Sequence, residues 1–323
     1  MKKLNLSEYV LRKIVLTTQK ICITLLSFYL KQIDIDNDEK RFFRSALLKD
    51  WSTQLSQIVD LLNYRQRIVV DSTSISVNLD GVNLEVSGTG RYFKIPGTAK
   101  NANEGKAFYE FFNETCSPID SVIDVGANVG EISLYFSKIC PRARILAIEG
   151  SSENYAILKR NANNQQFPID NLELIHRIIT DHDGETEISK GRGSENSIIG
   201  EVIGSSRTET VKASTLSSVI NEFNLDNSRI TFIKIDIEGA GPLLATDLIR
   251  IKPKFIFFEF GFVSFELYTE VLHFFREFYT PYKVDFFRAE FELIDHDKLK
   301  LDVQPSFGNR LGELSEAMFV RHT

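Results

Sequence analysis

Ser121–Gly130 reads S-V-I-D-V-G-A-N-V-G, and the rest of the chain can be placed around it. Three β-branched residues among the first five predict a strand that is covered on both faces of a sheet. Gly126 and Gly130 bracket a tight turn in which the backbone passes close to a neighbouring group. Apolar residues at helical spacing between 131 and 139 predict a helix that Pro141 ends. Together they predict the opening unit of a nucleotide-binding sheet.

The glycine spacing indicates which nucleotide this unit binds. A second strand is predicted at 143–148, and Glu149 stands at its end, where a carboxylate can accept hydrogen bonds from both ribose hydroxyls. A dinucleotide turn of the form G-x-G-x-x-G would need glycine in place of Asn128 and Glu131. The pattern present is D-x-G-x-N-x-G, and it places Asp124 where a methionine ammonium, but not a phosphate, would be bound. The sequence therefore favours S-adenosylmethionine over NAD.

Four motifs taken together resemble the FkbM family of S-adenosylmethionine-dependent methyltransferases. The motifs are D-V-G-A-N-V-G at 124–130, A-I-E at 147–149, N-Y-A-I-L-K-R-N at 154–161 and K-I-D-I-E-G at 234–239. The resemblance covers roughly residues 104–259. It implies an α/β fold with a doubly wound, mostly parallel Rossmann-like sheet and S-adenosylmethionine as cofactor. It also implies O-methylation of a sugar, a glycan or another polar biosynthetic intermediate.

The chain departs from the family's pattern at three positions. Gly150 stands where the family usually has a proline, and Leu216-Ser217-Ser218 stands where it has L-D-D. Gly241 stands where it has an acidic residue after E-G-A. Ser217 and Gly241 keep open a second interpretation, a non-catalytic interaction module on the same fold. A nicotinamide-dependent oxidoreductase is a third interpretation, against which the residues at 128 and 131 argue.

The turn and the strand ends supply the candidate cofactor-binding residues, which are Asp124, Gly126, Ala127, Asn128, Gly130, Glu149, Gly150, Thr180 and Asp181. The last two follow a predicted third strand at 172–179, and ligands bind outside the carboxyl ends of parallel strands. Asp181 can therefore accept a hydrogen bond from the adenine amino group. D-H-D at 181–183 and again at 295–297 raises the alternative of a metal site. Both are typical of solvated turns, and no metal is expected.

Two acids follow a fourth predicted strand at 230–237. Asp236 and Glu238 are two residues apart, so that in a strand both point to one face. Unpaired buried carboxylates are costly, and a purely structural account would not place two of them here. Lys234 can pair with one of them. We interpret Asp236 and Glu238 as the candidate catalytic residues, acting as the base for the acceptor hydroxyl or holding the acceptor.

The sequence divides into an N-terminal appendage of residues 1–95 and a methyltransferase domain of residues 96–323. The appendage is predicted to contain helices at 1–33 and 42–65 and a β-hairpin up to Val86. Residues 1–33 carry six basic residues against one acid. They indicate a contact with a membrane surface or a second copy, or a helix packed on its own domain. A small-residue loop is predicted at 96–104, and residues 97–106 are either a lid over the cofactor or a plain linker.

Composition sets the remaining bounds. The 323 residues are 43% hydrophobic and 25% charged, which is ordinary for a globular protein. The net charge of −6 argues against a nucleic-acid partner. Three widely spaced cysteines argue against a disulfide framework and favour a reducing compartment. We therefore expect a cytoplasmic enzyme that acts on a small-molecule or glycan acceptor.

Overall fold

The computed structural model describes residues 67–70, 75–79, 81–86, 95–114, 118–189, 208–237, 239–260, 268–285, 290–303 and 316–322. The chain divides into two compact units, Met1–Arg65 and Gln66–Thr323, and all described residues lie in the second. The helices predicted at 1–33 and 42–65 lie outside the described residues.

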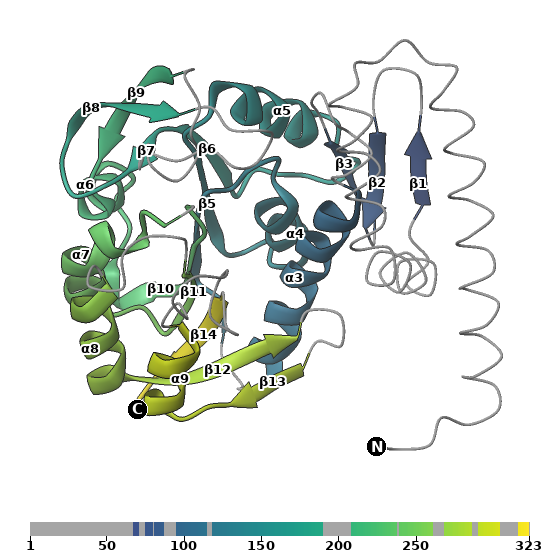
Figure 1. The fold of residues 1–323 in the computed structure, drawn as a ribbon. Coiled ribbons are helices and arrows are strands. Elements are labelled where there is room, and N and C mark those ends of the chain that lie inside the picture. The colour runs from purple at the N-terminus through teal and green to yellow at the C-terminus, as the bar shows by residue number, and fades with distance from the viewer. Residues whose placement is uncertain are drawn as a thin grey trace, which may run out of the picture. The chain divides into compact units, whose positions relative to one another are not determined.

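An eight-stranded sheet runs through this unit in the order β13-β12-β14-β11-β10-β4-β5-β6 (Figure 1). Its strands are β4 (Ser121–Val125), β5 (Arg144–Glu149), β6 (Leu172–His176), β10 (Ile230–Ile235), β11 (Phe255–Glu259), β12 (Tyr279–Asp285), β13 (Glu290–Leu293) and β14 (Glu316–Arg321). The strands from β11 to β6 are parallel, whereas β14, β12 and β13 pair antiparallel. The predicted doubly wound, mostly parallel α/β sheet is confirmed.

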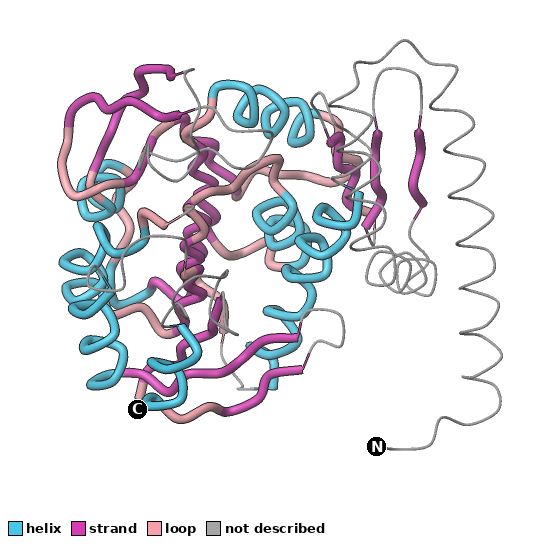
Figure 2. Tube along the Cα trace, in the orientation of Figure 1, coloured by secondary structure: helices cyan, strands magenta, loops and turns pink. Residues whose placement is uncertain are grey.

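Helices cover both faces of this sheet (Figure 2). They are α3 (Ile95–Glu114), α4 (Glu131–Ile139), α5 (Ser152–Asn163), α6 (Leu216–Glu222), α7 (Ala245–Ile251), α8 (Thr269–Phe278) and α9 (His296–Val303), with short 3-10 helices η3 (Asn227–Arg229) and η4 (Gly241–Leu244). Ile123 and Val125 of β4 pack in the core formed with α6, α7 and α8. Val122 points the other way and packs with Phe108 of α3 and Phe136 of α4. Burial on both faces explains why Val122, Ile123 and Val125 of this strand are all apolar.

The prediction of one strand at 172–179 is wrong. β6 ends at His176, and β7 (Ile178–Ile179) begins a second sheet of order β7-β9-β8, with β8 (Gly184–Ser189) and β9 (Thr208–Ser214). Arg177 lies at the break, where its guanidinium donates to both carboxylate oxygens of Glu222 in α6, at 2.6 and 3.1 Å. This ion pair fixes the point at which the chain leaves the large sheet. Residues 190–207, between β8 and β9, lie outside the described part of the chain.

Two segments predicted as loops are helices. Residues 96–104 belong to α3, because Pro96 suits a first helical turn and alanine and lysine follow it. The candidate lid at 97–106 therefore lies within a helix. The D-H-D at 295–297 begins α9 rather than a solvated turn. The Asp295 carboxylate accepts from the backbone N–H of Asp297 at 2.7 Å, as an N-cap does.

A third sheet precedes α3 in the chain. It consists of β1 (Arg67–Val70), β2 (Ile75–Leu79) and β3 (Val82–Val86), all antiparallel. Val82 and Leu84 of β3 pack with residues of α4 and α5, so that this hairpin belongs to the same compact unit as the large sheet. The domain boundary at residue 95 stays a prediction. A membrane crossing needs a longer and more apolar helix than any in the described ranges.

Candidate cofactor and catalytic site

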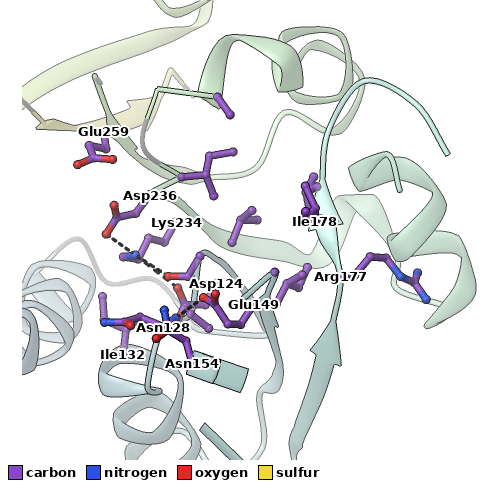
Figure 3. Close-up of a pocket in the computed structure, with 18 of the residues that line it drawn as sticks. Asp124, Asn128, Ile132, Glu149, Asn154, Arg177, Ile178, Lys234, Asp236 and Glu259 are labelled. Atoms are coloured by element: carbon purple, nitrogen blue, oxygen red, sulfur yellow. Dashed lines mark hydrogen bonds and ion pairs between the residues drawn. The ribbon is translucent and has the colours of Figure 1, made fainter. Parts of the chain in front are cut away.

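A cavity lies at the carboxyl ends of the parallel strands, where the strand order reverses between β4 and β10. Seven carboxylate side chains line it, and they belong to Glu104, Asp124, Glu131, Glu149, Asp236, Glu259 and Glu316. Figure 3 labels Asp124, Glu149, Asp236 and Glu259 among them. The cations in its described lining are Lys234 and Arg177, and Ile178 and Ile188 supply an apolar wall. A cavity with this charge favours a ligand that carries positive charge and hydroxyl groups over one that carries phosphate.

The glycine turn after β4 is shaped by its neighbours. Gly126 has φ of 83°, and a Cβ there would lie 1.9 Å from the carbonyl oxygen of Asp236. Only glycine fits, because the backbone following β10 occupies that space. The N–H groups of Gly126 and Ala127 both donate to the carbonyl of Ile148, each at 2.9 Å. Asn128 follows in the left-handed region at φ of 49°. The turn is thus held between the ends of β5 and β10.

Glu149 lies at the end of β5 with its carboxylate buried beside this turn. One oxygen accepts from the backbone N–H of Asn128 and the other from that of Ser151, each at 2.8 Å. Burial nevertheless raises the pKa of Glu149 to about 7, because the two backbone hydrogen bonds only partly offset desolvation. Each carboxylate oxygen can accept a second hydrogen bond. The site therefore fits a ligand with two adjacent hydroxyls, such as a ribose.

Lys234 lies between two carboxylates at the centre of the cavity. Its Nζ is 2.8 Å from Asp236 Oδ2 and 3.7 Å from Asp124 Oδ1. Burial lowers the pKa of Lys234, but the charges of Asp236, Asp124 and Glu104 outweigh it and raise the pKa, so the ammonium stays charged. Asp236 has 32% of its side chain exposed, whereas Lys234 has 5%. The lysine thus holds Asp236 in place while that carboxylate faces the open part of the cavity.

Asp124 is buried at the floor of the same group. Its Oδ2 accepts from the hydroxyl of Ser133 at 2.5 Å. Its Oδ1 is buried and has no hydrogen-bond partner within the described structure. Desolvation raises the pKa of Asp124, although Lys234 and Ser133 act against it. A buried acceptor that has an ion partner at 3.7 Å but no hydrogen bond suits a ligand that brings a donor or a further positive charge.

The structure brings most of the predicted site residues together. Those that line the cavity are Asp124, Gly126, Ala127, Asn128, Glu149, Gly150 and Asp236. Gly130 lies behind it as the N-cap of α4. Thr180 is buried outside the lining, and Asp181 is largely exposed, with its carboxylate 2.8 Å from His182 Nδ1. Glu238 lies outside the described residues. The roles assigned to all of these residues stay predictions.

Several lining residues had no assignment from the sequence. Glu104 comes from α3, whose first part had been predicted as a loop, and Glu316 comes from the last strand. Asn154 lies in the first turn of α5 and was visible only as part of the motif at 154–161. Ile178 and Ile188 come from the second sheet. No local pattern marks Glu316, because only the antiparallel insertion of β14 beside β11 brings it to the cavity.

Comparisons with known proteins agree with the geometry. The profile of the methyltransferase FkbM domain matches residues 124–280. The methyltransferase sdnD of Sordaria araneosa is 28% identical over an alignment of 170 residues. The match covers 41% of this chain and 64% of that protein. The chain therefore spans less than two thirds of that relative's length.

Similar solved structures include TYW2 of P. horikoshii in complex with MeSAdo, at a TM-score of 0.35 and 11% identity, over 78% of this chain and 72% of that one. Precorrin-6y C5,15-methyltransferase of Geobacter metallireducens matches at a TM-score of 0.32 and 13% identity, over 65% and 83%. At these TM-scores the fold rests on the sheet order above and not on these structures.

Proposed function

The chain belongs to the FkbM methyltransferase family through residues 124–280, and from this premise we propose that it methylates a hydroxyl group with S-adenosylmethionine as the methyl donor. The acceptor we propose is a sugar, a glycan or another polar biosynthetic intermediate. The observation that carries the proposal is the single cavity in which the D-x-G-x-N-x-G turn, Glu149 and the Lys234–Asp236 pair meet.

The residues of the cavity fit the proposed cofactor. S-adenosylmethionine, when bound, supplies a methyl group made electrophilic by its sulfonium charge. Glu149 would hold the ribose hydroxyls. Asp124 Oδ1, which accepts no hydrogen bond in the described structure, would face the ammonium. Ile178 and Ile188 would pack against the purine ring. The surrounding carboxylates favour a ligand with two positive charges and disfavour a pyrophosphate.

Asp236 is the base we propose for the acceptor. The Asp236 carboxylate would take the proton of the acceptor hydroxyl as the hydroxyl oxygen receives the methyl group that the sulfonium would supply, with S-adenosylhomocysteine as the other product. Lys234 donates a hydrogen bond to the carboxylate at 2.8 Å and fixes its direction. Alignment of oxygen, carbon and sulfur supplies much of the rate. Glu238 is the second candidate for the same role.

The far side of the cavity suits an acceptor rich in hydroxyls. Glu259 at the end of β11 is directly opposite Glu316 at the start of β14, and both line the cavity. Carboxylates accept hydrogen bonds from hydroxyl groups and repel phosphate. This supports a polyol or sugar as acceptor and argues against a nucleic acid. From the sequence we also propose a cytoplasmic location. We further propose that residues 1–33 contact a membrane surface or a second copy.

The non-catalytic alternative finds less support. Ser217 and Gly241 suggested it, yet both lie in packing outside the cavity lining. Ser217 donates to the Asp247 carboxylate through its N–H at 3.2 Å and also through its hydroxyl. A Cβ at Gly241 would lie 2.6 Å from the ring of Phe258. These departures from the family pattern are therefore accommodated by local packing.

A transfer assay tests the proposal. The full chain would be incubated with methyl-labelled S-adenosylmethionine and a panel of free sugars, nucleotide-linked sugars and glycans, and products would be separated and located by mass spectrometry. We expect a methyl ether on one class of acceptor. Binding of S-adenosylhomocysteine without transfer to any acceptor would support the non-catalytic alternative, and tighter binding of NAD would overturn the cofactor assignment.

A further inference from the structure

Two amide side chains cover the edge of strand β3 that does not pair with β2. One comes from helix α5 and the other from just beyond its end. Asn161 accepts from the N–H of Glu85 at 2.7 Å and donates to its carbonyl at 3.1 Å. Gln165, one turn on and just beyond the end of α5, accepts from the N–H of Asn83 at 3.0 Å and donates to its carbonyl at 2.6 Å. Four residues of helix rise about 6.0 Å and two residues of strand about 6.7 Å, so the spacings match. The two amides bond to β3 as a neighbouring strand would.

Asn161 makes one further bond that Gln165 does not make. Its Nδ2 also donates to the carbonyl oxygen of Val129, at 2.8 Å, inside the protein. Asn161 is 1% exposed and Val129 is 4% exposed, so water does not replace this bond. With two donor bonds and one acceptor bond, the Asn161 amide is nearly saturated. One side chain therefore touches both strand β3 and the glycine turn of the cavity.

Val129 occupies a sensitive position in that turn. Before it lies Asn128, held in the left-handed region, whose N–H donates to Glu149. After it lies Gly130, also left-handed, from which α4 begins. Asparagine adopts this conformation more readily than other residues with a side chain, and the bonds around Asn128 select it here. The bond from Asn161 fixes the peptide unit that joins Val129 to Gly130. This unit closes the turn, and it thereby restrains the conformation of Asn128, whose N–H bonds to Glu149.

We propose that Asn161 is a positioning residue for the cofactor turn, and that through it the docking of strand β3 sets the turn in the shape that receives the cofactor. The inference rests on the proposed function, because the cofactor is assigned there. Asn161 does not line the cavity and touches no reacting group. Its effect is therefore on affinity for the cofactor and not on the transfer step.

The matched variants are Asn161→Ala and Gln165→Ala in the full chain. Each removes two hydrogen bonds to β3 and one further bond. Asn161→Ala removes the bond to Val129, whereas Gln165→Ala removes the bond from Gln165 Nε2 to the carbonyl oxygen of Asn161, at 2.6 Å. Calorimetric titration with S-adenosylhomocysteine would give Kd, and thermal unfolding would give the stability of each variant. We expect Kd to rise about tenfold in Asn161→Ala, the loss expected from one buried hydrogen bond, and to stay within about twofold of the original in Gln165→Ala. Both variants should unfold at similarly lowered temperatures.

Hydrogen exchange provides a second readout that a loss of stability alone would not produce. The amide of Glu85 should exchange faster in Asn161→Ala and the amide of Asn83 in Gln165→Ala, whereas the amide of Asn128 should exchange faster only in Asn161→Ala. If Asn161→Ala does not fold, Asn161→Ser gives the same comparison, because it is uncharged and lacks the amide that donates to Glu85 and Val129.

Three outcomes decide the matter. A selective rise of Kd in the Asn161 variant, with faster exchange at Asn128, supports the inference. Equal Kd values in the two variants would overturn it while leaving the proposed function intact. No binding of S-adenosylhomocysteine to the unaltered chain would overturn the proposed function, and this inference with it.

Discussion

Ionisation of Glu149 should lower the stability of the protein without cofactor and raise its affinity for the cofactor. Burial raises the pKa of Glu149 to about 7 from an ordinary value of 4.5. Between these two values the folded protein keeps a proton on Glu149 that the unfolded chain has lost. The free energy of unfolding therefore falls as pH rises through this window. The perturbation that isolates the effect is Glu149→Gln, which keeps the shape and cannot ionise.

The expected size follows from the shift. A difference of about 2.5 pKa units, at about 1.4 kcal/mol for each, amounts to about 3 kcal/mol of stability that is present below about pH 4.5 and lost above about pH 7. Asp124, whose pKa burial also raises, contributes in the same direction. The quantity to measure is therefore the difference in unfolding free energy between the original chain and Glu149→Gln. That difference should change by about 3 kcal/mol across the window.

Affinity should change in the other direction. The ribose hydroxyls donate to the carboxylate, and a neutral acid is the poorer acceptor. With a pKa of about 7, the ionised fraction falls from about nine tenths at pH 8 to about one tenth at pH 6, which raises the Kd for S-adenosylhomocysteine about tenfold. Glu149→Gln should bind at least about tenfold more weakly at about pH 8 and show no such change with pH.

Two measurements check this reasoning. Urea unfolding followed by circular dichroism at several pH values gives the stability difference, and calorimetric titration at the same pH values gives Kd. If the original chain and Glu149→Gln show parallel stability curves, Glu149 does not carry the shifted pKa. If folded Glu149→Gln binds as tightly as the original chain, the carboxylate is not at the ribose.

Three other outcomes are expected. S-adenosylhomocysteine should bind and NAD should not, because the turn lacks the glycines that a pyrophosphate needs; calorimetric titration with both ligands decides this. Asp236→Asn should lower turnover about 10²- to 10⁴-fold with little change in cofactor Kd, and near-normal turnover at saturation would remove Asp236 as the base. Deleting residues 1–33 should leave cofactor Kd unchanged, because the described cavity is lined entirely from residue 104 onward; a folded truncated protein that no longer binds would contradict this.

The fold could be read from the sequence wherever a strand is buried on both faces. β4 and β10 are buried along their whole length and mostly apolar, because both of their faces are covered by helices. The start of α5 is also marked locally, since Ser151 caps its first turn. The break at Arg177 could not be predicted, because an apolar run continues across it. Only the ion pair to Glu222, 45 residues later, marks where the chain changes sheets.

The candidate site shows the same limit. Asp124, Glu149 and Asp236 were found because each stands at the end of a predicted strand, where ligands bind in this class of fold. Glu104 and Glu316 were missed, because they reach the cavity from a helix before the first parallel strand and from the final antiparallel strand. Chain segments far apart in sequence can meet only once the sheet is assembled, and no local pattern records that meeting.

The close approach at Gly126 changes what a family signature means. A side chain there would collide with the backbone carbonyl of Asp236, so that the glycine is demanded by the joining of two strands before any ligand enters. A descendant that had lost its chemistry would still need this glycine in order to fold. Retention of this glycine among relatives therefore reports ancestry and architecture. The junction does not require the Asp236 side chain. Relatives that keep the activity should therefore keep this aspartate, and relatives without activity should have lost it.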